Sequence, residues 1–190
     1  MYNLHTLVLS HLQTNCYIVA DKEKNCVIID PAGEFAKITA LLDKHGLTPK
    51  YILLTHGHFD HVLAAANLRT KYAAPIYINR KDEHYLSFPV DGYLKDSATF
   101  ELADITLEIL HTPGHTPGSV CIKMEEVLFS GDTLFQGTCG RCDLPGGNIE
   151  RIMQSLARLK ALEGDFTVYS GHGKKTTLNA ERYHNPYMKV

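Results

Sequence analysis

The chain has 190 residues, of which 44% are hydrophobic and 21% are charged, and its formal net charge is -2 at pH 7. This composition is typical of one soluble globular domain spanning residues 1–190, and the charge gives no reason to expect nucleic acid or an anionic membrane as a partner. No stretch approaches the roughly 18 apolar residues of a membrane span, and the N-terminus lacks the regions of a signal peptide, so we expect a cytoplasmic protein.

The five cysteines, an odd number, do not suggest a disulfide framework in a domain of this size. Cys139 and Cys142 form a C-x-x-C, a spacing shared by zinc and redox sites. No second pair and no thioredoxin-like context accompany it. We therefore expect ordinary reduced thiols, which fit a cytoplasmic setting.

The chain begins with strands and then continues with a helix and a buried strand. The strands are expected at residues 7–9, 16–19, 27–29 and 51–54, and the helix at residues 34–45, with Gly46 as its C-terminal stop. The helix carries an apolar stripe at helical spacing, which indicates core packing.

Four potential metal ligands follow the strand at 51–54 within the sequence THGHFDH, residues 55–61. If the extended path continues to His58, then His56 and His58 point to the same side, because side chains alternate along a strand. Asp60 and His61 are expected on a turn before a helix at residues 62–72. The histidines could also be a fortuitous surface run, but buried imidazole and carboxylate groups are costly unless a cation neutralises them.

The remaining elements again mix strands and helices. Residues 81–99 are expected to form a helix and an irregular connection. Strands are expected at residues 75–78, 105–111, 120–124, 127–130 and 166–169, with a helix from Asn148 to Gly164 and a short helix in the tail. Two β-rich halves with helices outside them predict a layered α/β sandwich.

Three further candidate ligands lie in glycine-containing loops directly after strands: His115, Asp132 and His172. His56, His58 and His115 would form a three-imidazole site. A second site would combine Asp60, His61 and His172, with Asp132 bridging both cations. Nitrogen and oxygen ligands without thiolates suit zinc, iron or manganese, and paired cations about 3.5–4 Å apart can share a hydroxide at neutral pH.

These motifs, in this order, resemble the metallo-β-lactamase superfamily. The resemblance implies a single-domain, four-layer αββα sandwich with two divalent metal ions, of which Zn²⁺ is expected first and Fe or Mn next. The segments around His115, Asp132 and Arg141 resemble the hydroxyacylglutathione hydrolases (glyoxalase II), most of all their short bacterial type. That likeness implies hydrolysis of a small-molecule thioester such as S-lactoylglutathione, giving lactate and glutathione, by a hydroxide shared between the metals.

The resemblance also implies roles for individual residues. Asp60 and Asp132 would be catalytic together with the hydroxide, and Arg141 would bind a substrate carboxylate. From their position close to His172, and not from the resemblance, Lys174 and Lys175 are expected to add positive charge at the mouth of the site. Asp30, at the end of a strand, either orients a ligand histidine or caps the helix near Glu34, and the sequence leaves both open.

Longer glyoxalase II enzymes add a C-terminal helical domain that helps to hold glutathione. The chain ends soon after His172, so we expect that domain to be absent and leave the thiol of the substrate open. Two other interpretations stay open: an iron-dependent persulfide dioxygenase of the same fold, and a metal-binding relative without catalysis. The oligomeric state is not predicted.

Overall fold

Two six-stranded β-sheets pack face to face in the computed structural model, which describes residues 2–189. In spatial order the first sheet contains β1 (Asn3–Leu9), β2 (Thr14–Ala20), β3 (Asn25–Ile29), β4 (Thr48–Leu53), β5 (Ile76–Ile78) and β6 (Gly92–Tyr93). The second contains β14 (Thr176–Thr177), β13 (Thr167–Ser170), β10 (Val127–Gly131), β9 (Val120–Met124), β8 (Ile105–His111) and β7 (Thr99–Leu102). A small hairpin joins β11 (Leu134–Phe135) and β12 (Thr138–Cys139).

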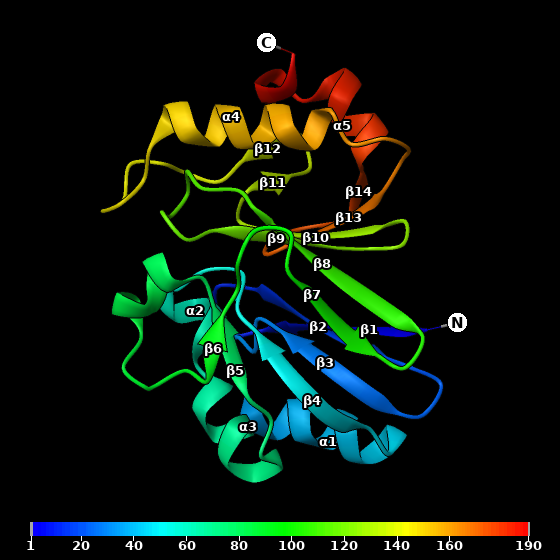
Figure 1. Cartoon of the computed structure of the whole chain (residues 1–190). Coiled ribbons are helices and arrows are strands. Elements are labelled where there is room, and N and C mark those ends of the chain that lie inside the picture. The colour runs from blue at the N-terminus through cyan, green and yellow to red at the C-terminus, as the bar shows by residue number, and fades with distance from the viewer. Residues whose placement is uncertain (1, 190) are drawn as a thin grey trace.

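Helices cover the outer face of each sheet (Figure 1). The helices α1 (Phe35–His45) and α3 (Ala65–Tyr72) lie against the first sheet, and α4 (Ile149–Lys160) and α5 (Leu178–His184) lie outside the second. The remaining helical segments are α2 (Phe59–Val62) and the 3-10 turns η1 (Arg80–Tyr85) and η2 (Pro186–Met188). The predicted four-layer αββα sandwich is therefore confirmed. Within residues 2–189, no helix combines the length and apolar character needed to cross a membrane.

The central strands are buried on both faces because each contributes to two cores. In β2, Ile18 packs into the core under the first helical layer, whereas Val19 faces the core between the sheets. In β10, Phe129 joins the core between the sheets and Leu128 joins the core beneath α4. Strands enclosed in this way have near-continuous apolar sequences, as these do.

Two predicted helices differ from the structure. The helix expected at residues 62–72 is broken into α2 and α3, because the amide of Ala64 donates to the carbonyl of Pro31 at 2.9 Å. Asp60 and His61 lie within α2, so the prediction that they lie on a turn was wrong.

The helix beginning at Asn148 ends at Lys160 and does not continue to Gly164. Its cap is as predicted, since the Asn148 side chain accepts from the amide of Arg151 at 2.9 Å. The early end is stabilised by Arg182, whose guanidinium donates to the carbonyl oxygens of Lys160 and Gly164, at 3.1 and 2.7 Å. A side chain thus satisfies carbonyl oxygens at and just beyond the end of the helix.

Short edge strands also escaped prediction. Residues 81–99 contain η1 and β6, and β7 begins at Thr99. Such two- to four-residue edge strands carry too few residues to show an alternating pattern.

The carboxyl ends of five strands meet at one edge of the sandwich. The strands β3 and β4 are parallel, β10 and β13 are parallel, and β8 and β10 share a direction because both are antiparallel to β9. A single bridge between Thr14 and His172 links the two sheets at this edge. Residues that directly follow these strands are thereby brought together.

Candidate metal centre

The ligand loop leaves the end of β4 and enters α2, so that one segment supplies side chains from two directions. His56 is 1% exposed and His61 is fully buried. His115 reaches the same space from the loop between β8 and β9, Asp132 from the end of β10, and His172 from the end of β13. All seven predicted ligands therefore lie at this edge, in two neighbouring groups.

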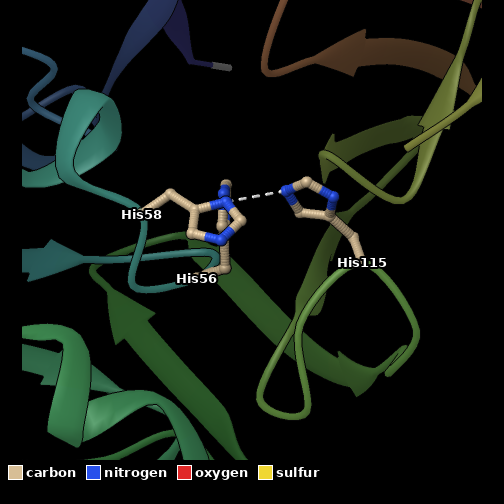
Figure 2. A group of neighbouring side chains, drawn as sticks. All are labelled: His56, His58 and His115. Atoms are coloured by element: carbon tan, nitrogen blue, oxygen red, sulfur yellow. Dashed lines mark hydrogen bonds between the residues drawn. The ribbon is translucent and has the colours of Figure 1, made fainter. Parts of the chain in front are cut away.

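The first half-site consists of His56, His58 and His115 (Figure 2), each with a potential ligand atom within 4.8 Å of the others. His115 donates from Nδ1 to the carbonyl of Arg141 at 2.8 Å, and its Nε2 lies 2.9 Å from Nδ1 of His58. Because Nδ1–H of His115 donates to the Arg141 carbonyl, a neutral His115 directs the lone pair of Nε2 toward the centre.

His56 is oriented in the same way. The Thr55 hydroxyl donates to Asp30 at 2.6 Å, so it accepts from Nδ1 of His56, 3.1 Å away. Nε2 of His56 is then a free acceptor, and this buried atom has no hydrogen-bond partner. An unpaired buried nitrogen of this kind is costly unless it binds a cation.

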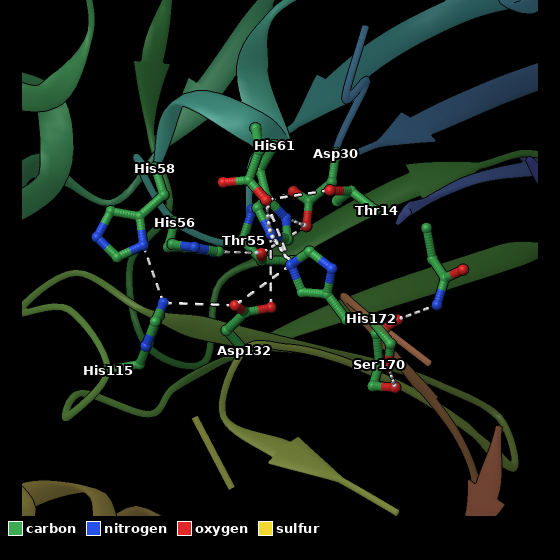
Figure 3. A network of polar contacts seen from close by, with 12 residues as sticks. Thr14, Asp30, Thr55, His56, His58, His61, His115, Asp132, Ser170 and His172 are labelled. Atoms are coloured by element: carbon green, nitrogen blue, oxygen red, sulfur yellow. Dashed lines mark hydrogen bonds and ion pairs between the residues drawn. The ribbon is translucent and has the colours of Figure 1, made fainter. Parts of the chain in front are cut away.

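The second half-site consists of Asp60, His61 and His172 (Figure 3). Nδ1 of His61 is held by Asp30 at 2.9 Å, and Nδ1 of His172 donates to the carbonyl of Leu12 at 3.2 Å. Their Nε2 atoms face each other at 3.3 Å. Two lone pairs at this distance repel each other, so a proton or a cation must lie between these rings and the nearby carboxylates.

Asp132 lies between the two half-sites (Figure 3). Its Oδ2 is 3.4 Å from Nε2 of His115 and 3.7 Å from Nε2 of His172, and its Oδ1 is 3.5 Å from Nε2 of His61. Oδ1 is buried without a hydrogen-bond partner. These unsatisfied atoms, together with a nitrogen and oxygen ligand set, fit a pair of divalent cations.

The pKa values of the imidazoles diverge between the half-sites. Burial, followed by the neighbouring His115, lowers the pKa of His58 to about 4, and burial lowers that of His56 well below its usual value. Burial opposes protonation of His61 too, but Asp132, Asp30 and Asp60 outweigh it and raise its pKa to about 9. A hydrogen bond to Asp60 raises the pKa of His172.

Asp60 is kept ionised by its surroundings. Burial alone would raise its pKa, but the hydrogen bond from His172, the nearby His61 and the hydroxyl of Thr14, 3.0 Å away, together lower it. Thr14 is the first residue of β2, and no motif in the sequence indicates its role.

A second buried aspartate, Asp82 of η1, was also missed. Its Oδ2 accepts from the amide of Gly57 at 3.0 Å and from the hydroxyl of Thr116 at 2.6 Å, and its Oδ1 accepts from the amide of Gly118 at 2.6 Å. Although fully buried, it sits in the charged segment RKDEH, which resembles a solvated surface. It ties the loop of His56 and His58 to the loop of His115.

Gly171 lies against the ligands and leaves no room for a side chain. A Cβ atom there would lie 2.2 Å from Oδ1 of Asp132 and 2.7 Å from Cε1 of His61. The glycine beside His172 therefore permits the close approach of the β13 loop to both half-sites.

The structure distinguishes the two interpretations of Asp30. Its carboxylate contacts Thr55 and His61, whereas the cap of α1 is Glu34, which makes no side-chain cap hydrogen bond. Asp30 adopts a left-handed backbone conformation, with φ of 49° and 2% exposure. It thus orients the ring of His61, one of the predicted ligands.

The predicted substrate residues lie on the surface. The guanidinium of Arg141 donates twice to Asp143, at 2.7 Å each, and its side chain is 62% exposed. Lys174 and Lys175 are exposed, and Nζ of Lys175 lies 5.9 Å from the ring centre of Tyr169. Substrate binding by these three side chains stays a prediction.

Comparisons with known proteins agree with this geometry. A family model described as the metallo-beta-lactamase superfamily matches residues 9–172. The hydroxyacylglutathione hydrolase GloC of Haemophilus influenzae is 35% identical, over 98% of each chain. The crystal structure of BLEG-1, described as a B3 metallo-beta-lactamase, has a TM-score of 0.94 and 35% identity, covering 99% of this chain and 100% of that one. TTHA1623, crystallised in a di-iron-bound form, has a TM-score of 0.86 and 38% identity, covering 96% and 99%.

Proposed function

Because the chain belongs to the metallo-beta-lactamase superfamily, we propose that it is a metal-dependent hydrolase of small-molecule acyl thioesters, similar to the hydroxyacylglutathione hydrolases. The observation that carries this proposal is the pair of half-sites, with the carboxylate of Asp132 between them. The name of the Haemophilus influenzae relative supports a thioester as the substrate.

The first half-site would hold one cation through His56, His58 and His115, and the second would hold another through Asp60, His61 and His172. When bound, a pair of divalent cations supplies activation of water near neutral pH and polarisation of a carbonyl group. We propose zinc, with iron as the competing metal, since the ligand set suits both and TTHA1623 holds iron.

The residues of the chain would prepare the reaction in defined ways. The hydroxyl of Thr14 donates to Asp60, whose carboxylate is an acceptor able to orient a water molecule. Asp30 fixes the ring of His61, and the Arg141 carbonyl fixes the ring of His115. Hydrolysis joins the oxygen of water to the acyl carbon and breaks the carbon–sulfur bond. The departing thiolate is a good leaving group, so no strong general acid is required.

The test combines metal analysis with a panel of substrates. The purified protein is expected to contain two divalent cations per chain and to release a free thiol from S-lactoylglutathione. His58→Ala is expected to lower kcat/KM by at least about 10²-fold, the scale of losing one electrostatic stabiliser in a hydrolase. His184→Ala provides a matched control, because this histidine is exposed on α5.

A β-lactam belongs in the panel because BLEG-1 is described as a B3 metallo-beta-lactamase. Glutathione persulfide is included to test the dioxygenase interpretation. Oxygen consumption with the persulfide, or β-lactam cleavage, without thioester hydrolysis would contradict the proposal. Full activity of His58→Ala would contradict the role of the centre itself.

A further inference from the structure

An uncharged groove of about 230 Å³ lies beside α2. Its walls include Phe59, Val62 and Leu63 of α2 and, from the other side, Tyr85 and Phe88. The other two lining residues are Ala66 and Ser87, so no charged residue lines this groove. Such a surface favours an apolar ligand.

The groove lies next to the metal centre. Asp60 and His61 point inward from α2 with exposures of 8% and 0%, whereas Phe59 and Leu63 on the same helix are 62% and 55% exposed. The ring centres of Tyr85 and His58 are 5.7 Å apart, so Tyr85 forms both a wall of the groove and a neighbour of the first half-site. A molecule that reacts at the centre can therefore extend into the groove.

The dimensions and chemistry of the groove select its occupant. Stable protein interfaces involve about 20–30 residues on each side. Seven residues line this groove, so a small molecule is the better fit. The common thiols that carry acyl groups, glutathione and coenzyme A, are anionic. The uncharged part of such a thioester is its acyl chain.

We propose that this groove binds the hydrocarbon chain of the acyl group and makes the protein selective for apolar acyl thioesters. The proposal rests on the proposed thioester hydrolysis and adds the substrate class. Phe59 and Leu63 are then specificity-determining residues, since their exposed side chains are covered only when an acyl chain is bound.

The test measures kcat/KM for acetyl, butanoyl, hexanoyl and octanoyl thioesters of a single thiol. We expect kcat/KM to rise about two- to fourfold per added methylene until the groove is filled. Leu63→Ser and Phe59→Ser are expected to flatten this dependence on chain length. Tyr183→Ser is the matched control, because Tyr183 is 74% exposed on α5, which covers the other sheet.

A second measurement separates this proposal from the proposed function. Octanoate is expected to bind the metal-loaded protein at least tenfold more tightly than acetate in calorimetry, and Leu63→Ser is expected to reduce that ratio. If thioester hydrolysis does not depend on chain length, or if both variants retain that dependence, the proposal that the groove binds the acyl chain is wrong. The proposed function would stay intact. Failure to cleave any thioester would overturn the proposed function. Equal binding of octanoate and acetate would then also overturn the proposal that the groove binds a hydrocarbon chain.

Discussion

The two half-sites use the same kind of ligand, imidazole, in opposite electrostatic surroundings. His56 and His58 lie among other histidines, and burial keeps their pKa values low. His61 lies among three carboxylates, which raise its pKa to about 9 despite its burial. At pH 7, His56 and His58 are thus neutral and ready for a cation, whereas His61 must exchange a proton for a cation.

The half-sites also differ in how they are supported. Asp30 contacts the ring of His61 directly and reaches His56 only through the hydroxyl of Thr55. Asp82 contacts only the backbone and a hydroxyl around the ligands of the first half-site. One centre thus combines a half-site whose pKa values are set by carboxylates with a half-site held by contacts between loops.

The largest effect is expected for Asp132→Asn, because Asp132 faces both halves. Loss of its charge should reduce the bound cations below two per chain and lower kcat/KM by at least about 10²-fold. Elemental analysis and thioester kinetics measure both effects. Asp43→Asn is the control, since this aspartate is 66% exposed and lies on α1. Retention of two cations and of full turnover would remove Asp132 from the centre.

The second prediction concerns acidification from pH 8 to pH 6. In the metal-free protein His61 is protonated below a pKa of about 9, so each lower pH unit should weaken cation binding there about tenfold. His58 stays neutral over this range because its pKa is about 4. Equilibrium dialysis against a metal buffer should therefore show the second half-site emptying first, by about 100-fold in affinity. Simultaneous loss of both cations would contradict the proposed difference in imidazole pKa between the two half-sites.

The third prediction is that Asp30→Asn weakens the second half-site by about 10–100-fold in cation affinity, the usual cost of removing the partner of a ligand histidine. The amide would place a donor against His61 or Thr55, which both donate to Asp30. Competition with a chelator measures the affinity. Asp21→Asn is a matched control, since Asp21 is 2% exposed and serves the turn before β3.

The smallest effect on the metal is expected for Asp82→Asn, which changes the support of the ligand loops and not a ligand ring. We expect about tenfold weaker binding at the first half-site, at the lower end of the cost of such outer partners. The free energy of unfolding should fall by about 1–3 kcal/mol, since a buried donor loses its acceptor. Chelator competition and denaturant unfolding measure the two effects. Selective loss at the second half-site would contradict the division of support.

The seven proposed ligands could be located from the sequence because each follows a strand or lies in one short motif. His115, Asp132 and His172 stand directly in loops rich in glycine, where strand order alone brings them to one edge. The layers were predictable for a related reason, since apolar runs in the strands show that both faces are buried.

The supporting contacts could not be predicted because they depend on tertiary packing. Asp82 lies in a charged segment, and only the fold shows that its carboxylate is buried between two ligand loops. Likewise, the sequence cannot show that the guanidinium of Arg141 pairs with Asp143 while its carbonyl holds His115. The break between α2 and α3 depends on a distant carbonyl, that of Pro31.

The bridge between Thr14 and His172 has a consequence for how the protein is made. Ribosomal synthesis proceeds from the N-terminus, so His56, His58 and His115 all emerge before His172. Thr14 and Asn15, made near the start, must wait for the last ligand loop, where the Asn15 amide donates to the carbonyl of Gly171 at 2.7 Å. In the order of synthesis, the three-imidazole ligand set is therefore complete before the second set, which needs His172.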